Sequence, residues 1–227
     1  MTNPERLRPL TLILIVLLVT GVAGILLWAL WSMQPVASGL SLQVREHLPV
    51  SGVNAEVTAI LMNFRGYDTL LEMAVLLAAL LGVWHLGPLQ LPQADNHPDP
   101  ILETLVRFLT PVIILVTGYV LWLGGHAVGG AFQAGALLAG AGVLLLMQPR
   151  VLVLRDHLVL RIMIVAGAAL FTFVAGMVMF TGGTLLEYPK QYAGALILLI
   201  EAASTVSIGL ILTLLFAGGA PRHGDKE

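Results

Sequence analysis

Four charged side chains occur next to or inside apolar stretches of the sequence. Arg65, Asp68 and Glu72 stand at the start of an apolar run that continues to Leu86, and Glu201 stands inside LILLIEAASTVSIGLILTLLF. Carboxylates in membrane helices are costly and commonly line proton or cation routes, because an apolar environment favours the neutral acid and lets the group load and release a proton. These four residues are therefore the candidates for ion translocation.

The spacing of the first three residues predicts a single charged helix face. Arg65, Asp68 and Glu72 are three and four residues apart, so they lie on one side of any helix that begins at or before Arg65. Arg65 can then neutralise Asp68 and leave Glu72 one turn deeper. The alternative is a salt bridge at the membrane surface, with the Glu72 side chain reaching outward to water.

Glu201 lies deeper in its apolar run, near the expected middle of the membrane. Ser204 and Thr205 follow it at the third and fourth positions and form a polar stripe with it. A carboxylate at that depth costs about 2.5–3.5 kcal/mol even on lenient insertion scales. The alternative to an ion-translocating role is a permanently protonated glutamate that hydrogen-bonds a neighbouring helix.

The stretch GGHAVGGAFQAGALLAGAG predicts close helix packing. Gly129 and Gly130 open an apolar segment, and Gly135 belongs to a row of small residues at four-residue spacing, which lets helices approach closely. His126, just before it, is interpreted as a structural residue. The histidines have no metal-ligand spacing, so we expect neither a metal nor another cofactor.

The composition places these residues in a membrane protein. Of 227 residues, 58 % are hydrophobic and 11 % are charged, whereas soluble domains carry about 25 % charged residues. The net charge of −2 gives no reason to expect nucleic acid as a partner. Because HExxH, GxSxG, phosphate-loop and dinucleotide-binding motifs are absent from the sequence, we do not expect an enzyme.

The apolar runs predict an all-α, polytopic transmembrane protein. Runs of about 18–20 residues are long enough to span a bilayer, and six segments qualify approximately. They are Leu10–Trp31, Leu70–Leu86, Leu105–Leu123, Gly130–Met147, Leu158–Phe180 and Ala193–Ala217. We further expect a bend at FRGYD, with Gly66 as its weak point.

Basic residues and prolines predict the orientation and the domains. With the amino terminus in the cytoplasm, eight basic residues fall inside and three outside, a positive-inside bias that places both termini in the cytoplasm. The four prolines of residues 88–104 mark a linker. We predict a two-helix part over residues 1–92, a linker over 93–104 and a four-helix part over 105–227.

Three segments resemble a known family. VTAILMNFRGYDTLLEMAVLLAALLGV resembles the DFRGFDTLGE-type segment of Mrp-type sodium/proton antiporters and of membrane-bound hydrogenases, with Asn63 where the family has Asp. TLVRFLTPVIILVTGYVLWLGGHAVGGAFQAG resembles the opening of the MnhB-type (B) subunit of those antiporters, although its glycine-rich part is one residue shorter and lacks a proline. LIEAASTVSIGLILTLLFAGG is similar to that subunit's last helix, in which an acidic residue stands at the position of Glu201.

The resemblance implies a subunit of a hetero-oligomeric complex in the inner (cytoplasmic) membrane. Its partners would be other membrane subunits, the lipid bilayer, monovalent cations such as Na⁺, and protons. Large subunits of such complexes carry lysine–glutamate relays, whereas both lysines here, Lys190 and Lys226, fall outside the predicted spans. The chain is therefore interpreted as a partner that lines part of a shared ion path. The amino-terminal part further resembles a piece of a separate or larger subunit.

Two alternatives remain at the level of sequence. The same module could serve a redox-driven complex such as a membrane-bound hydrogenase, because both kinds of complex reuse it. The chain could also be a structural assembly subunit whose carboxylates only hold helices together.

Overall fold

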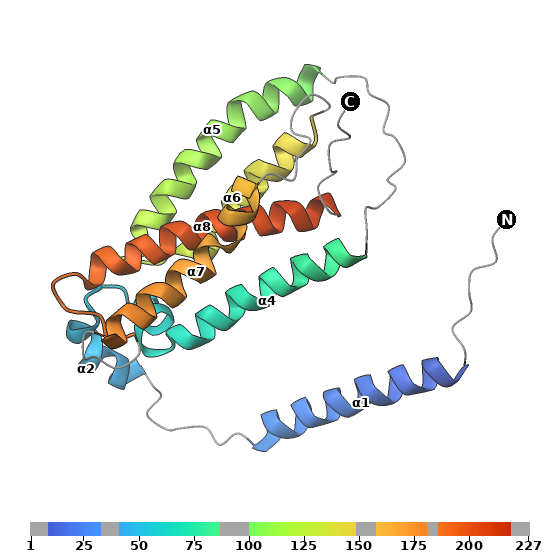
Figure 1. Cartoon of the computed structure of the whole chain (residues 1–227), viewed down its shortest axis with the longest axis horizontal. Helices are drawn as coiled ribbons and strands as arrows, with labels where there is room; N and C mark the ends of the chain where they lie inside the picture. Colours follow the sequence, from blue (N-terminus) through green and yellow to red (C-terminus); the bar gives the residue numbers. More distant parts are fainter. Residues whose placement is uncertain (1–8, 33–40, 87–99, 149–157, 181–185, 219–227) are drawn as a thin grey trace. The chain divides into compact units, whose positions relative to one another are not determined.

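The computed structural model describes residues 9–32, 41–86, 100–148, 158–180 and 186–218, and all regular structure in these ranges is helical. The chain divides into two compact units, residues 1–42 and 43–227. The first contains α1 (Pro9–Ser32), a helix without a charged residue (Figure 1). The predicted all-α membrane architecture is confirmed.

The remaining helices lie in the second unit, except for the first two residues of α2 (Ser41–Ser51). After α2 come the single turn α3 (Glu56–Ala59) and the π-helix η1 (Ile60–Phe64). The long helices are α4 (Gly66–His85), α5 (Pro100–Leu123), α6 (Ala131–Leu146), α7 (Leu158–Phe180) and α8 (Ala193–Ala217).

Each of the six predicted spans contains a helix, but the helices differ in length. Within the described residues, five are long and apolar enough to cross a membrane: α1, α4, α5, α7 and α8. Helix α6 has 16 residues, which gives a length of about 24 Å against a hydrocarbon core of about 30 Å. Helix α5 begins at Pro100, earlier than the predicted start at Leu105, because proline is tolerated in the first turn of a helix.

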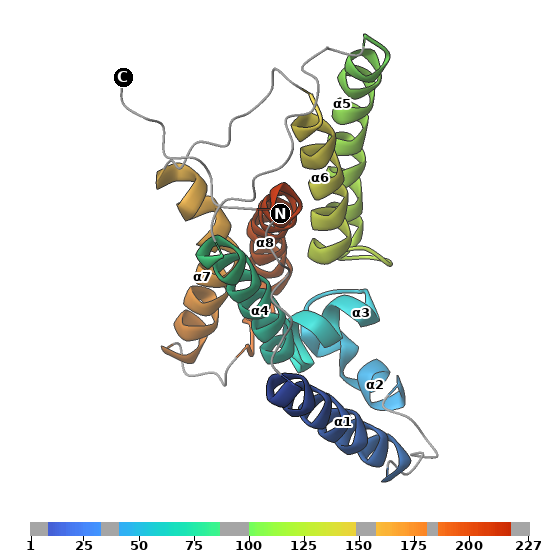
Figure 2. The same cartoon turned by 90° about the vertical axis from the view of Figure 1, so that its right-hand side faces the viewer.

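Helix α8 is the centre of the second unit. It contacts α4, α5, α6 and α7, and Figure 2 shows it between α6 and α7. Small residues allow these close contacts, because a Cβ at Gly135 of α6 would lie 2.8 Å from the Ile208 Cγ2 atom of α8. On the other side, a Cβ at Gly167 of α7 would lie 2.9 Å from the Ser204 Cα atom.

The predicted bend at FRGYD is a break between η1 and α4. Arg65 leaves helical geometry, with φ −127° and ψ 28°, and α4 begins at Gly66. The Arg65 N–H still donates to the Ile60 carbonyl, and the Thr69 hydroxyl donates to the Leu61 carbonyl at 2.7 Å. Gly66 lies where a Cβ would be 2.6 Å from the Leu186 Cδ1 atom, so the Leu186 side chain packs directly against the start of α4.

The connection into α8 closes one end of the unit. Leu186 and Tyr188 are buried in a core cluster with residues of α7 and α8. Burial raises the pKa of the Tyr188 phenol, so this side chain stays neutral at ordinary pH. Leu186 and Tyr188 therefore anchor the loop in the core, while Glu187 and the residues from Pro189 to Tyr192 are exposed.

Several predictions concern residues outside the described ranges. Most of the linker over 93–104 and both chain termini lie there. The cytoplasmic placement of the termini and the division into residues 1–92 and 105–227 therefore stay predictions.

Candidate functional site

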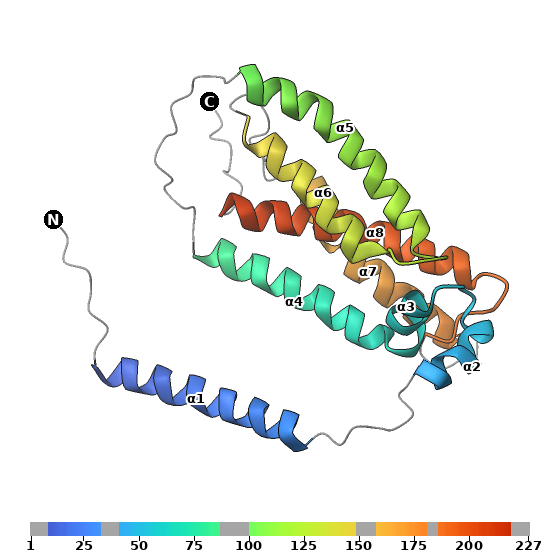
Figure 3. The same cartoon turned by 180° about the vertical axis from the view of Figure 1, so that it is seen from behind.

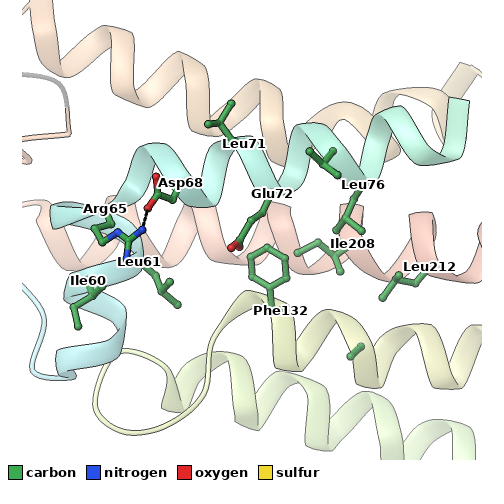
Figure 4. Close-up of a pocket in the computed structure, with 12 residues that line it drawn as sticks. Ile60, Leu61, Arg65, Asp68, Leu71, Glu72, Leu76, Phe132, Ile208 and Leu212 are labelled. Carbon is green, nitrogen blue, oxygen red and sulfur yellow. Dashed lines mark ion pairs between the residues drawn. The ribbon is translucent and has the colours of Figure 1, made fainter. Parts of the chain in front are cut away.

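The first candidate cluster lies at the start of α4. The Arg65 guanidinium forms an ion pair with the Asp68 carboxylate, as drawn in Figure 4. Glu72 follows one turn later on the same face, and its carboxylate lies beside the Phe132 ring of α6. The three residues thus share one side of the chain, as their spacing predicted.

These charged residues line a groove of about 880 Å³. Helices α4 and α6 lie on either side of α8, as Figure 3 shows, and η1 closes one end. Apart from Arg65, Asp68 and Glu72, the lining side chains are apolar: Ile60, Leu61, Leu71, Val75, Leu76, Phe132, Ala136, Ile208 and Leu212. The groove is open in the isolated chain, where Glu72 is exposed.

Glu201 occupies a different environment. Its side chain is 3 % exposed, and the backbone N–H of Ala131, the first residue of α6, donates a hydrogen bond to its carboxylate. A helix amino terminus favours an adjacent negative charge. Gly130 permits this approach, because it has φ +117° and a Cβ there would lie 2.9 Å from Glu201 Oε1.

The hydroxyl groups of Ser204 and Thr205, beside Glu201, form their described hydrogen bonds with groups other than the Glu201 carboxylate. The Thr205 hydroxyl donates to the Glu201 backbone carbonyl at 2.8 Å, and the Ser204 hydroxyl lies 3.4 Å from the Met73 sulfur of α4. Sequence spacing predicted a shared stripe, but these side chains bond the helix backbone and a neighbouring helix instead.

A second cavity, of about 200 Å³, reaches Glu201. His126, Trp122 and Asn54 also line it. The His126 and Trp122 rings lie 5.3 Å apart between centroids, at an interplanar angle of 38°. The sequence-predicted residues thus form two clusters, one around Glu72 and one around Glu201, and the first turn of α6 contributes to both.

The glycines singled out in the sequence have the geometry of close packing. A Cβ at Gly129 would lie 2.5 Å from the Val120 carbonyl oxygen of α5. Gly135 faces Ile208 and Thr205 of α8. Among the described residues, no group of three or more histidine, aspartate and glutamate side chains could hold a metal ion.

Comparison with protein families assigns the chain to a family. Residues 101–219, just over half of it, match a family described as a domain related to the MnhB subunit of Na⁺/H⁺ antiporter. The chain belongs to this MnhB-related family. It is a multi-pass membrane protein, in agreement with the resemblance found in the sequence and with its apolar helices.

One curated relative and two solved structures extend the comparison. An uncharacterised protein of Methanocaldococcus jannaschii is 32 % identical, over 39 % of this chain and 41 % of that protein. A chain of the Mrp complex from a Dietzia species matches 100 % of this MnhB-related chain with 23 % identity and a TM-score of 0.61. A chain of the membrane-bound sulfane sulfur reductase, an archaeal respiratory membrane complex, matches 92 % with 22 % identity and a TM-score of 0.69.

The lengths of the matched proteins differ. This MnhB-related chain spans less than half of the Methanocaldococcus protein and 27 % of the Dietzia chain, but 97 % of the reductase chain. The same fold thus occurs as part of a longer polypeptide and as a chain of similar length.

Sequence reasoning missed three residues of these sites. Phe132 faces Glu72, and Asn54 and Trp122 border the cavity at Glu201. One signal was present, because Trp122 and His126 are four residues apart, a spacing that brings side chains together on helical backbone, although α5 ends at Leu123. Asn54 carries no such signal, since it reaches the site from a distant part of the sequence.

Proposed function

We propose that this chain is a non-catalytic membrane subunit of a hetero-oligomeric Na⁺/H⁺ antiporter-type complex and lines part of its ion path. The observation that carries the proposal is the groove of Arg65, Asp68 and Glu72 in a member of the MnhB-related family. Within it, the Arg65–Asp68 pair would hold Asp68 ionised at the mouth. At least one of Glu72 and Glu201 would change protonation during transport.

The open side of the groove supports a shared path. Acyl chains against Glu72 would cost a few kcal/mol, because intramembrane carboxylates normally face protein or water. Other membrane subunits would therefore cover the groove and turn it into an enclosed route. The sequence places no lysine in a spanning helix, so a lysine-dependent proton relay would belong to a partner.

The proposal also places the chain in a particular membrane and gives each part of the chain a role. An ion-exchanging complex of this kind works across an energised membrane, so we place the chain in the cytoplasmic membrane with both termini inside. Residues 1–92 would contribute the groove wall with Arg65, Asp68 and Glu72, and residues 105–227 would contribute α6, α8 and Glu201.

The test replaces each carboxylate in the native complex. Glu72→Gln and Glu201→Gln keep the shape and much of the hydrogen bonding but remove the titratable proton. Both variants should assemble, and cation-dependent proton movement in membrane vesicles should fall about tenfold or more. Glu103→Gln is the matched control, because Glu103 is exposed in the first turn of α5 and lines neither cavity.

The opposite pattern would support a structural role. If both glutamine variants assemble and transport like the parent complex while Glu201→Ala disrupts assembly, the carboxylates only hold helices together.

A redox-driven complex is the second candidate. The observation that favours it is the match to almost the whole length of a chain from a respiratory membrane complex. Purification of the native complex decides between the candidates. Subunits with redox centres would support the redox-driven complex, and a complex without them would support the stand-alone antiporter.

A further inference from the structure

The cavity beside Glu201 lies where α5 ends and α6 and α8 begin. It has a volume of about 200 Å³, enough for several water molecules. Three parts of the chain enclose it: the segment between α2 and α3, the turn from α5 to α6, and the first turns of α8. The lining residues that define it are Gly52, Asn54, Gly125, His126, Gly194 and Ile197.

The cavity has both polar and apolar lining residues. Glu201 is buried and His126 is exposed, so His126 is the lining acid–base group that water reaches. Of the described lining residues, these two are the titratable ones, and Asn54 adds an uncharged amide. The walls include the apolar residues Val53, Ile197 and Leu198, so the cavity brings one exposed and one buried acid–base group to a largely apolar space.

The position of His126 is defined by several contacts. Its ring packs at 5.3 Å from the Trp122 ring between centroids, and its backbone N–H donates to the Leu123 carbonyl at 2.9 Å. The turn that carries it accepts a hydrogen bond from the Asn54 N–H at the Gly125 carbonyl, 3.2 Å away. The buried Thr58 hydroxyl donates to the neighbouring Gly124 carbonyl. The mouth of the cavity is thus tied to the segment that forms its other wall.

We propose that this cavity is the water-filled entry through which Glu201 exchanges protons with the aqueous phase, and that His126 passes the proton at its mouth. The neutral imidazole takes a proton from bulk water, releases it through cavity water to the Glu201 carboxylate and returns to the neutral form. Histidine suits this step because its charge changes between about pH 5 and 8. The relay rests on the proposed function, since it requires Glu201 to titrate during transport.

Access of water can be measured without transport. The chain has no cysteine, so an introduced thiol is its sole thiol. Ile197 and Ile200 are 1 % and 0 % exposed, but only Ile197 lines the cavity. In the native complex, Ile197→Cys should react with a small charged thiol reagent about tenfold faster than the matched control Ile200→Cys, because thiol reactivity follows access to water. Equal, slow labelling of both would overturn a hydrated cavity.

The role of His126 is tested by the pH profile of transport. His126→Gln keeps a polar side chain without a titrating group, and it should slow cation-dependent proton movement about tenfold, with a changed pH dependence. His85→Gln is the control, because His85 is exposed near the opposite end of α4 and lines neither cavity. An unchanged rate and pH profile in His126→Gln would overturn the relay.

The two experiments separate this inference from the proposed function. If Ile197→Cys labels slowly while Glu201→Gln blocks transport, the entry is wrong and the proposed function survives. If Ile197→Cys labels quickly but Glu201→Gln transports like the parent complex, the proposed function fails, and the proton relay fails with it.

Discussion

Gly130 decides how closely α6 can approach the Glu201 carboxylate. It has a positive φ of 117°, a conformation that side chains other than glycine rarely adopt. A Cβ would also lie 2.9 Å from Glu201 Oε1, in the space that the carboxylate uses to meet the Ala131 N–H. The residue therefore serves both the backbone turn and the burial of the acid.

The first prediction is that Gly130→Ala destabilises the protein. Backbone strain at such a position costs about 1–3 kcal/mol, and displacement of Glu201 from the Ala131 N–H adds to the loss. Thermal unfolding of the detergent-solubilised complex measures it. The matched control is Gly140→Ala on the same helix, where a Cβ meets nothing within 4 Å. Equal melting temperatures for the two variants would contradict the prediction.

At the scale of single residues, the sequence was informative where partners are close in the chain. The spacing of Arg65, Asp68 and Glu72 predicted one face, because a helix brings the third and fourth neighbours together. Glu201 was recognised as unusual from its apolar surroundings. Its neighbours His126, Gly130 and Asn54 could not be predicted to meet it, since tertiary packing brings them from distant parts of the sequence.

At the scale of elements, the contact between α6 and α8 depends on glycines, which have no side chain to keep the helices apart. Gly135 faces Ile208, and Gly142 faces Thr213, whose hydroxyl donates to the Gly209 carbonyl at 2.7 Å. Without a hydrophobic driving force in lipid, such helices associate through close van der Waals packing. The same contact holds the first turn of α6 between the Glu72 groove and the Glu201 cavity.

The second prediction is that Gly135→Leu weakens the structure and its assembly. A leucine side chain cannot fit 2.8 Å from the Ile208 Cγ2 atom, so the helices must separate, at a cost of about 1–3 kcal/mol or more. Native gels and thermal unfolding of the complex measure the effect. Gly140→Leu is the matched control, because space is open at that position. An intact and fully active Gly135→Leu complex would contradict the close contact between α6 and α8.

The sequence was enough to predict that each long helix exists, but not where every helix begins or ends. Long apolar runs without charge leave little choice but a helix, because the backbone must satisfy its own hydrogen bonds in lipid. The π-helix Ile60–Phe64 was not foreseen, since its geometry follows from the local bonds of Arg65 and Thr69. The start of α5 at Pro100 was also missed, although proline is favoured at the first position of a helix.

At the scale of the whole molecule, the orientation in the membrane is the third prediction. The distribution of basic residues places both termini in the cytoplasm. Cysteines introduced at Ser41 and at Gly224, which lies outside the described residues, should therefore react with an impermeant reagent from opposite sides of the membrane. Intact and inverted vesicles distinguish the two sides. Labelling of both positions from one side would overturn this topology.

The last prediction concerns what covers the groove of Glu72. Val75 lines this groove about two turns after Asp68 and is 67 % exposed in the isolated chain. If a partner subunit closes the groove, as the cost of a lipid-facing carboxylate requires, a photo-crosslinking residue at Val75 should join this chain to another membrane subunit. The same variant in membranes without the partner subunits is the control and should give no such product. A Val75 probe that crosslinks only to lipid in the native complex would show that the groove faces the bilayer, and Glu72 would then reach the surface beside the Arg65–Asp68 pair instead of lining an ion path.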